Sequence, residues 1–164
     1  MSVQEQRLEH TPMGRGLASW KQGLAAGLCG TLGISAVEAV RDRLLGHRAP
    51  YAASRIAERL AWRLARVRLS PRAARWSGTA LRYGYGPLLG VLQARASRHT
   101  ARWPLPARGL AAGAALSAME RLTLPLTGAT PPARRWSRAE RLALPLQALA
   151  FGLVTAAALQ RARA

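Results

Sequence analysis

The stretch from Leu142 to Gln160 constrains this chain more than any other, because it holds 19 residues without a single charge. An α-helix rises about 1.5 Å per residue, so a run of this length matches the hydrocarbon thickness of a bilayer, about 30 Å. Long uncharged stretches of this kind are typical of membrane-spanning helices. The run therefore predicts a helix that crosses a lipid bilayer.

Three further apolar runs precede it, and each has close to the length of a span. Glycine and proline are frequent in the chain, at 15 and 10 residues, and membrane helices tolerate both better than soluble helices do. We expect an all-α fold, a bundle of four transmembrane helices in one membrane domain over 17–164. A polar tail over 1–16 precedes it, without the basic and apolar order of a signal peptide. The expected spans are 17–40, 74–94, 109–126 and 142–160.

Tryptophan positions support these spans independently of hydropathy. Four of the five tryptophans lie just ahead of the four expected spans, at Trp20, Trp76, Trp103 and Trp136. Amphipathic indole rings concentrate where hydrocarbon meets headgroups. We therefore predict that these four side chains are interfacial anchors.

The segment 51–69, between the first two spans, has a different pattern. Its apolar residues recur at helical spacing, and four arginines recur in the same rhythm on a neighbouring face: Ile56, Leu60, Leu64, Val67; Arg55, Arg59, Arg63, Arg66. This separation predicts an amphipathic helix lying on an anionic membrane surface. The alternative is a solvated helix of a soluble bundle.

The phrase Gly-Leu-Ala-Ala-Gly occurs twice, at 23–27 and 109–113, and related Ser-Ala-x-Glu phrases follow at 35–38 and 117–120. The pattern indicates a two-helix unit used twice, with 85–86 (Tyr-Gly) matched to 151–152 (Phe-Gly). Glycines one turn apart let helix backbones approach closely. We predict packing at these glycines, including contact between Gly27 and Gly113. The packing residues are Gly23, Gly27, Gly86, Gly90, Gly109, Gly113 and Gly152.

Several charged residues fall inside the expected spans, and three of them can come together. With alternating helix directions, Glu38, Arg82 and Glu120 come to one level, so an intramembrane charge cluster is geometrically allowed. Ionisable groups within spans usually face the bundle interior and pair with one another. The cluster has either a structural or interfacial role, or a role in transport or proton relay.

The net charge is +18, from 25 Lys and Arg against 7 Asp and Glu. Such an excess predicts a polyanionic partner, either anionic lipid headgroups or nucleic acid. The uncharged run favours the bilayer and makes nucleic acid the less favoured partner. Lys and Arg number 14 on the side of the amphipathic helix and 9 on the side of the termini, which weakly favours termini outside. We expect a multi-pass protein of a bacterial inner membrane, with a membrane-protein partner or a second copy as a possible neighbour.

Chemistry-bearing residues are sparse. The three histidines, His10, His47 and His99, lie far apart and outside the spans, and Cys29 is the one cysteine. Neither a zinc site nor a Glu-x-x-His di-iron motif is present. A phosphate-binding glycine loop and a serine nucleophile elbow are also missing. We expect no enzyme activity, with no catalytic, metal-binding or cofactor-binding residues and no cofactor.

The chain resembles the small four-helix bacterial inner-membrane proteins of the YagU-like kind over about 23–160. The resemblance is carried by the small residues of 23–33, the Tyr-Gly-Tyr-Gly stretch 83–86, the span end 120–125 and Phe-Gly at 151–152. In such proteins a histidine is expected ahead of the last aromatic-glycine pair, where this chain has Gln147. The resemblance implies membrane location. The expected function is a non-catalytic scaffold or accessory subunit; the alternatives are a small proton- or cation-coupled transporter using Glu38 and Glu120, and a basic soluble helical protein that binds nucleic acid.

Overall fold

The computed structural model describes residues 12–46, 49 and 52–162, and this part of the chain is all-α, without strands. Its elements are α2 (Pro12–Leu45), α3 (Ala53–Ala65), α4 (Pro71–Ala96), α5 (Leu105–Leu126), a 3-10 turn η1 (Ala133–Arg135) and α6 (Arg138–Arg161). The all-α prediction is confirmed. α2 begins at Pro12, a residue that fits a first helical turn, and so inside the predicted polar tail 1–16; residues 1–11 lie outside the described residues.

Local sequence explains where the helices begin and end. Ser70 caps α4 by accepting a hydrogen bond from the amide of Ala73, and Pro71 follows it in the first turn. Ser137 and Glu140 form a reciprocal capping box at the start of α6. Such caps satisfy amides that have no partner inside the helix. At the C-terminal end of α3, Arg66 takes a left-handed conformation, with φ 57°, and terminates the helix.

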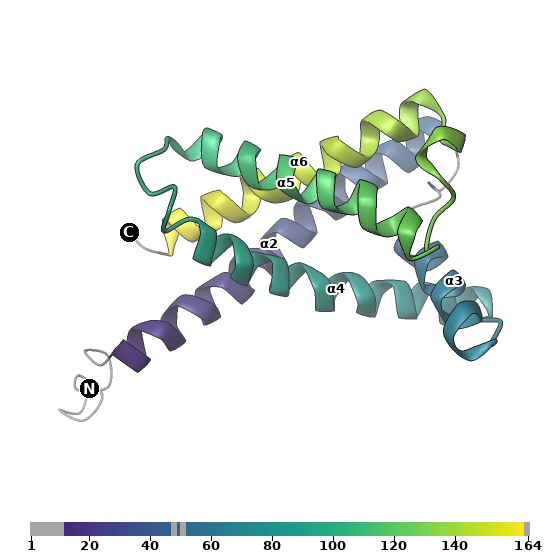
Figure 1. Ribbon diagram of the computed structural model, residues 1–164, viewed down its shortest axis with the longest axis horizontal. Helices are drawn as coiled ribbons and strands as arrows, with labels where there is room; N and C mark the ends of the chain where they lie inside the picture. The colour runs from purple at the N-terminus through teal and green to yellow at the C-terminus, as the bar shows by residue number, and fades with distance from the viewer. Residues whose placement is uncertain (1–11, 47–48, 50–51, 163–164) are drawn as a thin grey trace.

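The four long helices alternate in direction along the bundle. Figure 1 shows α2 and α5 running one way and α4 and α6 running back, with both ends of the described chain on the left and α3 at the opposite end. α2 packs on α4 and α6, α5 packs on α6, and α3 packs on α4. α4 and α5 follow each other in the chain but make no extensive contact with each other. The bundle is therefore open between these two helices.

Glycines set the closest helix contacts. A Cβ atom on Gly27 would lie 2.5 Å from the carbonyl oxygen of Gly86 in α4, and one on Gly90 would meet the backbone of Gly27. In the second pair, a Cβ on Gly113 would lie 2.6 Å from the carbonyl oxygen of Ala148 in α6. Such backbone contact has no space for a side chain. The predicted packing role of the glycines is thus seen in both helix pairs.

The predicted contact between Gly27 and Gly113 is wrong, because each glycine faces the second helix of its own pair. The contact was a prediction from the repeated Gly-Leu-Ala-Ala-Gly phrase, and the two helix pairs resemble each other in a different way. Gly90 lies between Gly23 and Gly27, and Gly152 lies in the same manner between Gly109 and Gly113. Gly90 rather than Gly86 is therefore the counterpart of Gly152. The predicted alignment of the second helices was off by four residues, about one helical turn.

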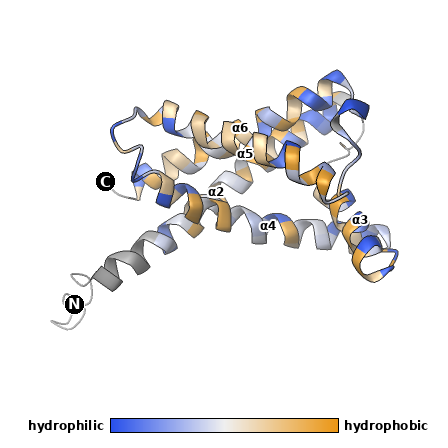
Figure 2. Cartoon of the chain, in the orientation of Figure 1, coloured by the Kyte–Doolittle hydropathy of each residue, from blue (hydrophilic) through white to orange (hydrophobic). Residues whose placement is uncertain are grey.

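Many large apolar side chains lie on the outside of the bundle, and only a few, such as Leu144 and Phe151, lie in its interior. Thr31 and Thr155 are the largest fully buried side chains, and much of the remaining interior is alanine and glycine. Large apolar side chains point outward along every helix, among them Leu32, Leu88 and Leu146 at 58, 61 and 58% exposure. Figure 2 shows hydrophilic residues, in blue, mainly towards the ends of the bundle, with pale to orange segments along the helices between them.

Two helices are long and apolar enough to cross a membrane, 20–44 within α2 and the whole of α6. The expected first span, 17–40, corresponds to the former and the expected run 142–160 lies inside the latter. α4 and α5 are not among the qualifying helices. Both carry charge within the expected spans, at Arg82 in α4 and at Glu120 and Arg121 in α5.

Replacing Gly27 by alanine is expected to destabilise the fold by about 1–3 kcal/mol, because the added methyl group meets backbone rather than a movable side chain. Gly84 offers a matched control, since it is exposed in α4 and a Cβ there meets nothing within 4 Å. Gly84→Ala should leave stability unchanged or raise it by up to about 1 kcal/mol through helix propensity. Chemical denaturation of the purified variants measures both, and equal effects would contradict the packing role.

Candidate functional site

An ion pair joins α2 to α4. The Nη2 atom of Arg82 contacts Oε2 of Glu38, and Arg82 Nη1 donates a hydrogen bond of 3.3 Å to the hydroxyl of Ser35. Arg41, one turn beyond Glu38 on α2, approaches its other carboxylate oxygen at 3.4 Å. The structure therefore brings together two of the three residues expected in the charge cluster, Glu38 and Arg82.

The ion pair between Glu38 and Arg82 is largely shielded from solvent. The Glu38 and Arg82 side chains are 14 and 22% exposed, and Arg41 is 5% exposed. A desolvated charge is costly unless it is paired and hydrogen-bonded. Here the pairing follows from the glycine contacts, which hold the backbones of α2 and α4 close enough for a long side chain to cross between them. The Glu38 carboxylate is thus neutralised from its own helix and from α4.

Glu120 behaves differently. It is partly buried on α5 and lines the same cavity as Glu38 and Arg82, yet it forms no ion pair or hydrogen bond with any residue in the described part of the chain. The Tyr85 phenol of α4 is close enough to interact electrostatically with its carboxylate. The third residue of the expected cluster therefore shares the cavity but does not join the salt-bridge network.

This cavity, named here the α4–α5 cavity, has a volume of about 310 Å³. It lies where α4 and α5 fail to pack, with α6 as its floor, α2 behind it and the first turns of α3 at one end. Its walls are mainly apolar. The apolar side chains that line it are Ile34, Ile56, Leu60, Leu81, Leu89, Leu124, Leu144 and Phe151.

Gln147 is the residue of the cavity whose role the sequence analysis missed. It is only 6% exposed on α6, and its side-chain amide nitrogen has no hydrogen-bond partner within the described residues. A buried amide without a partner costs free energy, so an occupant that supplies one is favoured. The available signal was a polar residue inside the uncharged run. Ser35 and Arg41 were missed as well, although both lie one turn from Glu38.

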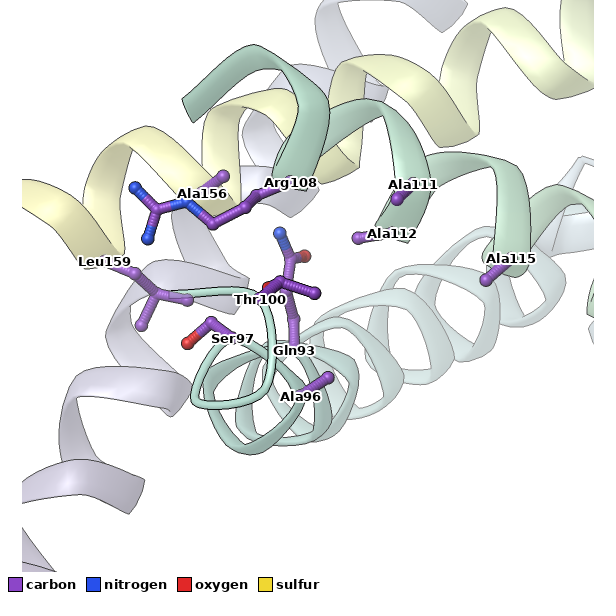
Figure 3. A pocket seen from close by; sticks show the side chains of 10 residues that line it. All are labelled: Gln93, Ala96, Ser97, Thr100, Arg108, Ala111, Ala112, Ala115, Ala156 and Leu159. Atoms are coloured by element: carbon purple, nitrogen blue, oxygen red, sulfur yellow. The ribbon is translucent and has the colours of Figure 1, made fainter. Parts of the chain in front are cut away.

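A second, smaller cavity of about 200 Å³ lies between α4, α5 and α6, near the C-terminal end of α4 and the N-terminal end of α5. Figure 3 shows Gln93 rising from α4 towards the alanines of α5, with Arg108 extending along α6. Gln93 donates a hydrogen bond of 2.9 Å to the carbonyl oxygen of Gly152, and Arg108 donates one of 3.2 Å to Gln160. These two polar groups therefore tie the helices together.

Three of the four tryptophans predicted to be interfacial anchors are exposed. They are Trp20, Trp76 and Trp103, and their role as anchors stays a prediction. Trp136 contradicts the prediction: it is 3% exposed, packs with Leu144 and donates a hydrogen bond of 3.0 Å to the carbonyl of Pro131. A fold-back of the chain between α5 and α6 covers it. Trp62, the exception in sequence, is exposed, with Arg68 above its ring.

The amphipathic segment is shorter than predicted. α3 covers 53–65 rather than 51–69, so Arg66 and Val67 lie beyond its last turn. Tyr51 is outside the described residues. Ile56 and Leu60 face the α4–α5 cavity, whereas Leu64 is 83% exposed. The apolar stripe is therefore divided between the bundle and the outside.

Comparisons with protein-family models, with curated proteins and with solved structures find no match for this chain. The resemblance to YagU-like proteins stays a prediction. Among the described residues no group of three or more His, Cys, Asp or Glu side chains is placed to hold a metal ion.

A double-mutant cycle on Glu38→Gln and Arg82→Gln is expected to give a coupling energy of about 1–3 kcal/mol, since the two partly buried charges contact each other. The measurement is the free energy of unfolding of the two single variants and the double variant. Arg75→Gln provides the control, because Arg75 is exposed on the same helix and lines a neighbouring pocket with Glu38. Coupling for the 38/82 pair no larger than for the 38/75 pair would refute the proposed link.

Proposed function

We propose that this chain is a multi-pass protein of a bacterial inner membrane, with α2, α4, α5 and α6 as four spans, and that it serves as a non-catalytic scaffold or accessory subunit. The observation that carries the proposal is the exposure of large apolar side chains. Leucines are exposed along all four helices, while much of the interior is threonine, alanine and glycine with a few large side chains such as Leu144 and Phe151. In water this arrangement would expose a large apolar area, and monomeric soluble proteins rarely do so.

Lipid removes that cost, because acyl chains are as apolar as leucine. Helix association in a bilayer then depends on close van der Waals packing and interhelical hydrogen bonds. Both are present, in the glycine contacts and in bonds such as that from Gln93 to Gly152. Arg82 and Glu120 made α4 and α5 the weaker spans by composition. Their side chains line the α4–α5 cavity, which supports spanning by these helices as well.

The ends of the bundle fit a bilayer with anionic headgroups. Exposed arginines gather on α3 and around the start of α6, and further basic residues lie between α4 and α5. Exposed tryptophans accompany them at both ends, at Trp62, Trp76 and Trp103 among others. Basic side chains near an anionic surface are each worth about 1 kcal/mol of attraction. α3, with arginines on one face, is proposed to lie in this interface.

A scaffold or accessory role is supported by how the polar groups are used. Gln22 donates to the carbonyl of Ala162, and Arg121 donates to that of Arg141, so each joins one long helix to another. The glycine faces of the helices are buried in contacts within the bundle, so they are not free to bind a partner. A partner, or a second copy, would therefore dock against the outward leucine faces.

The membrane proposal predicts that the protein stays in the pellet when membranes are extracted with alkaline carbonate. Cys29 supplies a depth probe, because it lies inside the span 20–44 and is exposed on the bundle. In intact vesicles a membrane-impermeant maleimide should label it at least tenfold more slowly than in the detergent-denatured protein.

The control places the cysteine near a membrane surface, in the variant Cys29→Ser with Ser77→Cys. Ser77 is exposed next to Trp76, so it should label in vesicles oriented with that end accessible. Recovery in the carbonate supernatant together with rapid labelling of Cys29 would overturn the membrane proposal. That outcome would favour the basic, soluble nucleic-acid-binding alternative.

The second candidate function is proton- or cation-coupled transport through Glu38 and Glu120. It is favoured by one observation, a carboxylate without an ion-pair partner in the α4–α5 cavity. In reconstituted vesicles Glu120→Gln should then reduce ion-coupled flux by at least tenfold, because the group that binds the ion is gone. An unchanged flux in this variant would rule the candidate out.

A further inference from the structure

The α4–α5 cavity holds one carboxyl group, that of Glu120, without a cationic partner in the described part of the chain. Glu38 is paired with Arg82 and Arg41, Arg41 also binds Asp42, and the two terminal nitrogens of Arg82 contact Glu38 and Ser35. Glu120 has no such partner within the described residues. An unpaired carboxylate in apolar surroundings is stabilised by any cation that enters. The cavity thus prefers a cationic occupant, although the chain as a whole has a net charge of +18.

The walls decide what kind of cation fits. A metal ion such as Mg²⁺ or Ca²⁺ needs about six or more oxygen ligands. The α4–α5 cavity offers mainly apolar side chains, with Glu120, the ion-paired Glu38 and Arg82, and scattered threonine and tyrosine hydroxyls. In the described part of the chain, no group of three or more His, Cys, Asp or Glu side chains is placed to hold a metal ion. Small-molecule sites are commonly apolar chambers of about 300–1,000 Å³ with a few polar groups that fix orientation. The volume of about 310 Å³ places this cavity at the small end of that range.

Gln147 provides an observation that is independent of charge. Its amide is nearly fully buried on the floor of the cavity and its nitrogen lacks a partner in the described part of the chain. On the opposite wall, the Tyr85 phenol lies close enough to Glu120 to interact with its carboxylate. A ligand with a polar cationic end and an apolar body satisfies the carboxylate and fills the chamber. A further polar atom on the ligand would satisfy the amide.

We propose that the α4–α5 cavity is a binding site for a small protonated amine that carries an aromatic or aliphatic group, with Glu120 binding the ammonium and Leu89, Leu124 and Phe151 enclosing the apolar part. The site goes beyond a scaffold role and does not require transport. It rests on the proposed membrane fold only in that the protein is handled in detergent.

The test uses the full chain purified in a mild detergent and three probes with the same ring: 2-phenylethylamine, 2-phenylethanol and phenylacetate. Calorimetric titration should show the amine binding at least tenfold more tightly than the alcohol, because only the amine supplies a positive charge. Phenylacetate should bind more weakly still, since its carboxylate is repelled by Glu120. This comparison uses the unaltered protein, so it does not depend on the folding of any variant.

Variants then test whether the probes bind in the α4–α5 cavity. Glu120→Gln should weaken amine binding at least tenfold and leave alcohol binding unchanged, whereas Leu89→Trp should abolish both by filling the chamber. Glu58→Gln is the matched control, because Glu58 is exposed on α3 and does not line the cavity. It should change nothing.

The proposal is overturned if none of the three probes binds, if amine and alcohol bind equally, or if Glu120→Gln leaves amine binding unchanged. Each of these results can occur in a protein that resists carbonate extraction. A failure of this proposal is therefore distinguishable from a failure of the membrane proposal.

Discussion

The architecture depends on backbone contact between helices at glycine. α2 meets α4 at Gly27 and Gly90, and α5 meets α6 at Gly113 and Gly152, at distances that leave no space for a side chain. Helices held this close associate through dispersion forces and gain little from burying large apolar groups. Both pairs use the same contacts, so the unit is a glycine-fastened helix pair built twice. Many of the large apolar side chains are thereby left on the outside.

The two copies are not used symmetrically. α6 packs on α5 and also on α2, whereas α4, its counterpart, has no comparable packing against α5. A repeat that closed fully would have filled this gap. Because it stays open, the α4–α5 cavity forms there, and α3 extends across one end of it. The inserted α3, which has no counterpart in the second copy, lies where the symmetry is broken.

The charges follow from the same asymmetry. Arg82 comes from the helix that α2 contacts closely, so its guanidinium reaches Glu38 and forms a partly buried pair. Glu120 comes from α5, on the far side of the gap, and stays outside that pair although it shares the cavity. One carboxylate is therefore held in an ion pair, and the other has no ion-pair partner among the described residues. Gln147 on the floor adds a buried amide without a partner within the described residues. The cavity combines an apolar body with two distinct polar groups, which is the usual composition of a small-molecule site.

The sequence by itself determined the elements and much of their use: helices over the expected apolar runs, glycines as packing positions, the nearness of Glu38 and Arg82, and exposed tryptophans at three of four positions. These features depend on local composition and on helix periodicity, which a sequence displays directly. The partners of the glycines, the burial of Trp136, the register of the second repeat and the isolation of Glu120 were decided only by the tertiary structure. Residues four apart lie on the same side of a helix, so a sequence pattern does not distinguish two alignments that differ by one turn. Which neighbouring helix that side contacts is set by how the helices pack. Here α6 packs on both α5 and α2.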